Sequence, residues 1–241
     1  IKKPKIAVLT EGKISPYAYG ELWHYFEQDL NYSFHQIRVN QLSENVIKKI
    51  DVLIMPSGLY PSLSSEPKKE MIMRWLNQGG RIVAIERALS FFEDKKFFGL
   101  KRKENKIKRD PTQRYDERKR NNISNAINGG IYKTILDNSH PIGLGYSTDY
   151  YTLKRSALAY SLLEKGINVS YIPKGATAVA GFVGKNVANA QEKSLIIGSE
   201  PIGKGSVSYF VDNPIFRSFW ENGKLFFANA LFMSNINLFE L

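Results

Sequence analysis

Two sets of residues have the types and spacing of known catalytic groups. His24-Tyr25-Phe26-Glu27 and the distant His140 supply two imidazoles and a carboxylate, which suits an open catalytic zinc site. They also fit an amphipathic helix and a turn histidine before Pro141. Ser65-Glu66-Pro67-Lys68 has the Ser-x-x-Lys spacing of a serine acylation centre. A serine before Glu-Pro is, however, typical of a helix N-terminus. We expect neither a metal site nor a catalytic serine here.

A third set of polar residues follows apolar runs that have the composition of buried strands. In a parallel sheet the carboxyl ends of the strands meet at one edge, where ligands bind. Such a cluster can bind a small molecule, or its groups can satisfy one another around an inactive site. We favour the inactive site. The candidate residues are Glu11, Ser57, Glu86, Arg87 and Asp212.

The first part of the chain alternates predicted strands with predicted helices, which is typical of a parallel sheet covered on both faces. After a basic segment, the remainder is richer in short strands and loops. It includes a hairpin around Pro-Ile-Gly-Lys-Gly and ends in an aromatic-rich helix. The expected strands are 5–10, 34–39, 51–55, 81–85, 130–136, 194–198 and 206–211, and the expected helices are 17–30, 43–49, 66–77, 87–92 and 215–233.

The composition excludes several classes of protein. The 241 residues contain no cysteine, so disulfides, thiolate metal sites and cysteine nucleophiles are absent. No apolar run approaches the roughly 20 residues that span a bilayer. The net charge is +11, but residues 95–120 alone carry 12 Lys+Arg and 4 Asp+Glu, a net of +8. We expect this segment to be a solvated or mobile excursion from a nearly neutral single domain, 1–241.

Five stretches of the sequence, in this order, resemble the class I glutamine amidotransferase-like domain at the C-terminal end of large Bacteroidetes-type zinc carboxypeptidases. They are PKIAVLTEGKISPYAYGELWHYFEQDLNY, DVLIMPSG, LNQGGRIVAIERALSFF, HPIGLGY and GKGSVSYFVDNPIFRSFWENGKLFFANALF. The resemblance covers nearly the whole chain. It implies an α/β fold with a flavodoxin-like, doubly wound and mainly parallel sheet, extended by a β-rich C-terminal portion.

The resemblance also implies that the amidotransferase site is degenerate. Active members carry a cysteine on a Gly-x-Cys-x-Gly elbow after a strand, and here that place reads Ala84-Ile85-Glu86-Arg87-Ala88. The family's catalytic histidine aligns with Asp212. A carboxylate at the elbow cannot form the thioester that amide transfer requires, so this chain is not expected to be an enzyme.

The function that we expect from the resemblance is a non-catalytic accessory domain of a zinc carboxypeptidase. The zinc, the upstream peptidase domain as partner, a peptide substrate and a secreted or periplasmic location all belong to that expectation. The chain itself is expected to hold no cofactor. It begins at Ile1 rather than Met, so we expect a fragment or a processed product. Two alternatives remain open: a small-ligand or carbohydrate-binding domain, and nucleic-acid binding through residues 95–120, which is the less favoured.

Overall fold

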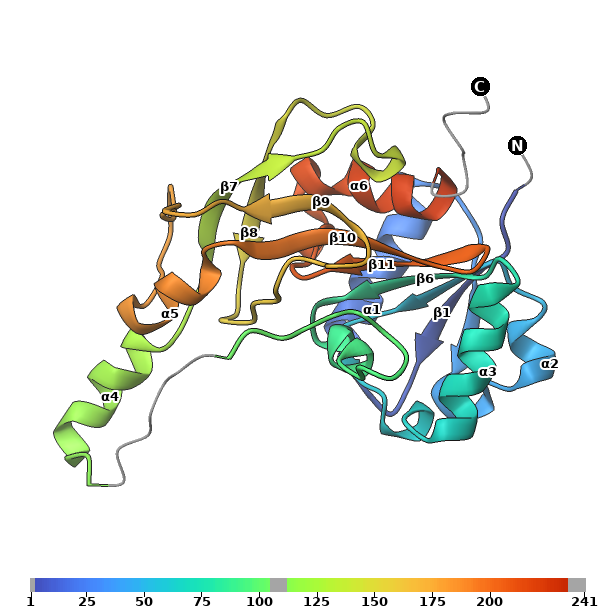
Figure 1. Ribbon diagram of the computed structural model, residues 1–241, viewed down its shortest axis with the longest axis horizontal. Coiled ribbons are helices and arrows are strands. Elements are labelled where there is room, and N and C mark those ends of the chain that lie inside the picture. The colour runs from blue at the N-terminus through green and yellow to red at the C-terminus, as the bar shows by residue number, and fades with distance from the viewer. Residues whose placement is uncertain (1–2, 105–111, 234–241) are drawn as a thin grey trace.

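The computed structural model describes residues 3–104 and 112–233. Its main feature is a nine-stranded sheet in the order β3-β1-β4-β6-β11-β10-β9-β7-β8 (Figure 1). A second sheet pairs two short strands. The strands are β1 (Ile6–Thr10), β2 (Lys13–Ile14), β3 (His35–Arg38), β4 (Val52–Met55), β5 (Gly58–Leu59), β6 (Arg81–Ile85), β7 (Gly130–Leu136), β8 (Asp149–Lys154), β9 (Ile167–Ile172), β10 (Ser194–Ile202) and β11 (Gly205–Phe210).

Six α-helices accompany the sheet within the described residues, with shorter helical turns between them. The α-helices are α1 (Pro16–His24), α2 (Glu44–Ile47), α3 (Glu66–Asn77), α4 (Tyr115–Ser124), α5 (Lys185–Gln191) and α6 (Glu221–Phe232). The π-helical turn η1 (Tyr25–Asp29) continues α1, and the 3-10 turns are η2 (Val39–Gln41), η3 (Pro61–Leu63), η4 (Glu86–Phe92), η5 (Pro141–Gly143) and η6 (Phe216–Ser218).

The two halves of the sheet differ in strand direction. β3, β1, β4, β6 and β11 pair in parallel, and they form the predicted doubly wound part. The predicted hairpin then reverses the chain, so β10 is antiparallel to β11, and β9, β7 and β8 continue in antiparallel fashion. The expected β-rich portion is therefore an extension of the same sheet.

Both faces of the parallel half are buried. In β1, Ala7 and Leu9 pack in one apolar cluster with α2 and α3, whereas Ile6 and Val8 pack in a second cluster with α1 and α6. Successive side chains of a strand point to opposite faces, so helices on both sides bury every position of β4 and β6, whereas the edge strand β3 remains largely exposed. This explains why the sequence shows continuous apolar runs rather than alternation.

Two predicted helices differ from the observed ones. Residues 87–92 form the 3-10 turn η4, which begins one residue earlier at Glu86. The predicted helix over 215–233 begins only at Glu221, because Arg217 and Ser218 have positive φ angles of 48° and 58°. A left-handed backbone cannot continue a right-handed helix.

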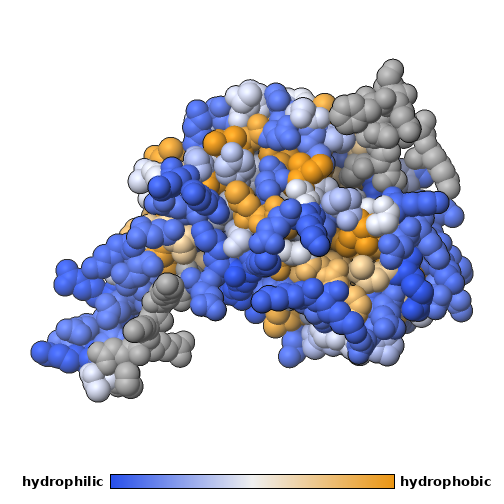
Figure 2. Space-filling view, in the orientation of Figure 1, coloured by the Kyte–Doolittle hydropathy of each residue, from blue (hydrophilic) through white to orange (hydrophobic). Residues whose placement is uncertain are grey.

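The basic segment also differs from a uniformly solvated excursion. Phe98 and Leu100 are buried in the core, and Arg102 forms a β-bridge with Tyr160. Beyond the undescribed residues 105–111, the chain forms α4, which has no buried residue and projects from the body together with α5 (Figure 1). Figure 2 shows this projection covered mainly by hydrophilic residues.

No helix among the described residues is both long and apolar enough to cross a membrane.

Candidate functional site

The candidate site lies at the carboxyl edge of the parallel strands. β1, β4, β6 and β11 end at this edge and are followed by Glu11, Ser57, Glu86 and Asp212. The chain adds β3 on one side of β1 and β4 on the other, so strand order reverses between β1 and β4. Ligands of doubly wound sheets bind beyond such a reversal.

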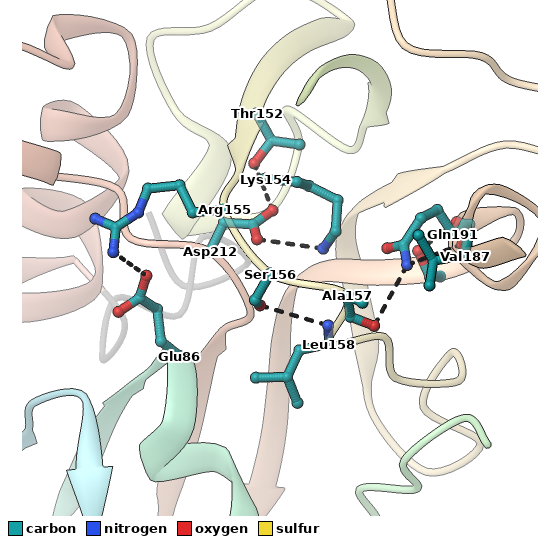
Figure 3. A network of polar contacts seen from close by, with 11 residues as sticks. Glu86, Thr152, Lys154, Arg155, Ser156, Ala157, Leu158, Val187, Gln191 and Asp212 are labelled. Carbon is teal, nitrogen blue, oxygen red and sulfur yellow. Dashed lines mark hydrogen bonds and ion pairs between the residues drawn. The ribbon is translucent and has the colours of Figure 1, made fainter. Parts of the chain in front are cut away.

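Glu86 is the first residue of η4 and lies on the sharp turn directly after β6. Its φ of +50° is unusual for a residue other than glycine. The side chain is 18% exposed and lies 4.0 Å from the Arg155 guanidinium (Figure 3). Burial raises the pKa of the Glu86 carboxyl, and the nearby charges of Asp212 and Glu21 add to this, while Arg155 and Ser57 oppose it. Glu86 is therefore a partly desolvated carboxyl held on a strained turn.

Asp212 is enclosed by two partners from β8. Thr152 Oγ1 donates to one carboxylate oxygen at 2.8 Å, and Lys154 Nζ donates to the other at 3.2 Å (Figure 3). The side chains of Lys154 and Asp212 are 0% and 7% exposed. Because both oxygens of Asp212 already accept hydrogen bonds, its carboxylate is occupied by structural contacts.

The segment after Asp212 is fixed to α1 by one carboxylate. Glu21 accepts from Asn213 Nδ2 at 2.7 Å and from the backbone N–H of Arg217 at 2.9 Å. These bonds hold the segment in the conformation with positive φ at Arg217. In this conformation the guanidinium of Arg155 lies over the ring of Phe216, with the Arg155 Cζ atom 3.9 Å from the ring centroid.

Three of the five predicted site residues come together. Ser57 contacts Glu86, and the charge of Asp212 acts on Glu86. Glu11 instead lies in the open with a φ of +68° and pairs with Arg38 at 2.8 Å. Arg87 is also exposed.

Sequence reasoning missed several residues of this cluster. Thr152 and Lys154 lie on the buried face of β8, where Tyr150 is their buried neighbour. Polar residues at alternate positions of a strand are a recognisable pattern, but the sequence predicts only short strands and loops over residues 142–182. Glu21 and Arg155 carry no local pattern that could have identified them.

The other motifs have structural roles. His140 Nδ1 accepts from the N–H of Ile142 at the start of η5, and His24 ends α1. Within 3–104 and 112–233, no three His, Asp or Glu side chains gather as metal ligands. Ser65 precedes the first residue of α3, and Lys68 Nζ donates to the backbone carbonyl of Leu42 at 2.5 Å.

The raised pKa of Glu86 predicts a pH dependence of stability. The folded state binds the proton of Glu86 more tightly than the unfolded state does. The charged carboxylate therefore lowers the free energy of unfolding at pH values above the ordinary pKa of 4.5, and this loss disappears as the pH falls below that value. In Glu86→Gln this titration is absent. We expect the wild type to lose stability relative to Glu86→Gln as the pH rises from about 4 to about 8. Urea unfolding of both proteins checks this, and a wild type that gains relative stability with rising pH would contradict it.

Comparison with known proteins gives the fold. No protein-family model matches the chain, and no curated protein matches it in sequence. Among solved structures, a GMP synthase-like protein of Thermoplasma acidophilum matches with a TM-score of 0.57 and 10% identity, over 96% of this chain and 94% of that protein. The chain has a class I glutamine amidotransferase-like fold.

Two further solved structures are similar to this chain in fold. A ThuA-like protein of Parabacteroides merdae matches with a TM-score of 0.57 and 10% identity, over 96% of this chain and 90% of that protein. A β-galactosidase of Bacillus circulans sp. alkalophilus matches with a TM-score of 0.52 and 12% identity, over 99% of this chain but only 31% of that enzyme. At these identities the likeness shows the fold alone.

Proposed function

We propose that this chain is a non-catalytic amidotransferase-like domain. The observation that carries the proposal is Glu86 on the sharp turn after β6, the position that the sequence resemblance aligns with the cysteine nucleophile of active members. A carboxylate there cannot form the thioester intermediate of amide transfer. The Arg155 guanidinium lies 4.0 Å from the Glu86 carboxylate. Thr152 and Lys154 donate hydrogen bonds to the two carboxylate oxygens of Asp212, the residue that the sequence resemblance aligns with the catalytic base. The nucleophile and the base are thus both replaced by groups engaged in structural contacts.

We further propose that the domain serves as the accessory end of a bacterial zinc carboxypeptidase that acts outside the cytoplasm. The support is the resemblance of five ordered sequence stretches to such domains. In this proposal the zinc and the catalytic residues belong to an upstream peptidase domain, which is also the partner.

The native gene product tests the accessory role. Purified from its own cells, it is expected to be much heavier than the 27.5 kDa of this chain and to contain zinc. Removal of the zinc with a chelator is expected to abolish peptide hydrolysis, because a catalytic zinc activates the attacking water. A zinc-free product of about the mass of this chain would contradict the accessory role, while the non-catalytic site would stand.

Small-ligand binding is the second candidate. A pocket of about 240 Å³ lies beyond β2 and β5, next to the reversal in strand order, and Tyr60, Phe91 and Lys13 help to line it. Pockets at such a reversal are the default ligand sites of doubly wound sheets. A thermal-shift screen of sugars and amino acids without a hit would count against this candidate.

Nucleic-acid binding has weaker support. Several cations of the basic segment are already engaged: Lys101 pairs with Glu164 at 2.7 Å, and Lys103 Nζ donates to the carbonyl of Glu192 at 2.5 Å. Among the cations of this segment that the structure describes, the exposed ones that remain are mainly on α4, where the Arg118 guanidinium lies over the ring of Tyr115. Binding through this segment would have to weaken steeply with salt.

A further inference from the structure

The pocket beyond β2 and β5 is formed by segments that the fold brings to one place. β2 pairs with β5 in antiparallel fashion, with Lys13 opposite Leu59. A Cβ atom on Gly58 would lie 2.7 Å from the Ile14 Cα atom, so only glycine lets the two strands approach this closely. The turns η3 and η4, which follow β5 and β6, complete the wall. The residues that line this cavity of about 240 Å³ include Lys13, Leu59, Tyr60, Ser64, Ser90 and Phe91.

The pocket itself carries one positive charge. Lys13 is the one charged residue among those that line it. Glu11, two residues earlier, is paired with Arg38 at 2.8 Å, and among the described residues no carboxylate forms an ion pair with the Lys13 ammonium. An ammonium carries three hydrogen-bond donors and no acceptor. Lys13 therefore leaves a cation with free donors available to a ligand.

The surroundings of the pocket do not cancel this charge. Lys69 lies over the ring of Phe91 and is paired with Asp94, so these two charges balance each other. The Glu86 carboxylate likewise has the Arg155 guanidinium 4.0 Å away. The pocket therefore has a net positive charge, and it attracts an anion.

Two serine hydroxyls give the pocket hydrogen-bond acceptors. Ser64 Oγ donates to the backbone carbonyl of Tyr60 at 3.1 Å, and Ser90 Oγ donates to that of Arg87 at 2.9 Å. A hydroxyl has a single donor, so each serine oxygen is left with its lone pairs for a ligand that donates. A ligand ammonium would be repelled by Lys13, whereas ligand hydroxyls donate without carrying a charge.

The volume and the apolar walls of the cavity restrict the ligand to a small molecule. Drug-sized ligands occupy pockets of about 300–1,000 Å³, and this cavity is smaller. Tyr60 and Phe91 are buried aromatic residues, and the Tyr60 hydroxyl is already engaged because it donates to the carbonyl of Pro56 at 2.6 Å. Their rings and the side chain of Leu59 therefore offer apolar contact to the carbon skeleton of a ligand.

We propose that this pocket binds an anionic monosaccharide. Its charged group pairs with Lys13, and its hydroxyls donate to Ser64 and Ser90. The C–H face of its ring packs against Leu59 and Phe91. This assignment rests on the small-ligand candidate described above, whose ligand class it names, and it does not depend on the accessory role. A sugar acid and a sugar phosphate share this chemistry, because lysine meets either anion as a point charge.

Titration of the purified chain, followed by ligand-observed NMR, tests the proposal. The anionic sugars are glucuronate, galacturonate and glucose 6-phosphate, and the matched neutral sugars are glucose and galactose. At least one anionic sugar is expected to bind about tenfold or more tightly than its neutral parent, because a hydrogen bond to a charged group is added. The anion that binds more tightly identifies the ligand as a sugar acid or a sugar phosphate.

Three variants assign the binding to this pocket. Lys13→Gln is expected to weaken binding of the anionic sugar by about tenfold and to leave that of the neutral parent unchanged. Ser90→Ala removes a neutral acceptor and is expected to weaken binding of both sugars by about fivefold. Lys119→Gln removes the same charge as Lys13→Gln, but on the projecting α4, and is expected to leave binding unchanged. Thermal unfolding of each variant confirms that it is folded.

Four outcomes would overturn the proposal. They are no binding of any anionic sugar, equal binding of the anionic sugars and their neutral parents, binding of acetate as tight as that of glucuronate, or full binding by Lys13→Gln. If amino acids bind and the sugars do not, the small-ligand candidate stands and the monosaccharide assignment fails. All of these results are independent of the mass and zinc content of the native product.

Discussion

Asp212→Asn is expected to destabilise the chain by about 3 kcal/mol or more. The side chain keeps its shape, but the Lys154 ammonium loses its counter-charge while it remains completely buried. Removing one partner of a buried ion pair is costly because the other charge is left without compensation. Urea unfolding at neutral pH measures the loss.

A surface pair provides the matched control. Lys133 and Asp149 lie 3.0 Å apart, with side chains that are 52% and 38% exposed. Asp149→Asn makes the same chemical change in water and is expected to cost less than about 1 kcal/mol. The double variant Asp212→Asn with Lys154→Met removes the stranded charge and is expected to recover much of the lost stability. If Asp212→Asn and Asp149→Asn lowered the free energy of unfolding equally, burial of the Lys154–Asp212 pair would not be the cause of the loss.

Gly223→Ala is the second substitution with a large expected effect. Gly223 lies in the first turn of α6, and a Cβ there would come within 2.1 Å of the backbone oxygen of Pro214. A backbone atom cannot rotate away, so α6 must shift from the segment that carries Asp212 and Phe216. Overpacking of this kind costs about 1–3 kcal/mol, and we expect a loss at the upper end of that range.

Gly20→Ala is the appropriate comparison, because Gly20 lies inside α1 and a Cβ added there would have nothing within 4 Å. Alanine is favoured over glycine in a helix interior, so this variant is expected to gain about 0.5–1 kcal/mol. Thermal unfolding of both variants provides the measurement. A Gly223→Ala protein that is as stable as Gly20→Ala would contradict the close packing of α6 on Pro214.

The parallel half of the fold could be predicted from the sequence because its strands are buried on both faces. The runs at 5–10, 51–55 and 81–85 are continuous and apolar, and each corresponds to an observed strand. The segment 213–220 could not be predicted in the same way. Its apolar residues suggest a helix, whereas the positive φ angles of Arg217 and Ser218 depend on Glu21, which is 196 residues before Arg217 in the sequence.

The candidate site was predictable only where it depends on strand ends. Ser57, Glu86 and Asp212 follow strands closely, so the topology alone brings them to one edge. Arg155 and Lys154 reach the same edge from β8, the last strand of the antiparallel extension, which the sequence did not place. Glu11 and Arg87 also follow strands, yet they are exposed, because position along the chain does not determine side-chain direction at a sharp turn.

Glutamine hydrolysis is the most direct test of the claim that Glu86 has replaced a catalytic group. The purified chain is incubated with glutamine, and ammonia release is compared with that of Glu86→Ala and of a protein-free blank. The account predicts that all three release ammonia at the same rate, because neither a carboxylate nor alanine at the elbow forms a thioester. Ammonia release by the wild type that Glu86→Ala abolishes would contradict it and would make Glu86 a catalytic residue.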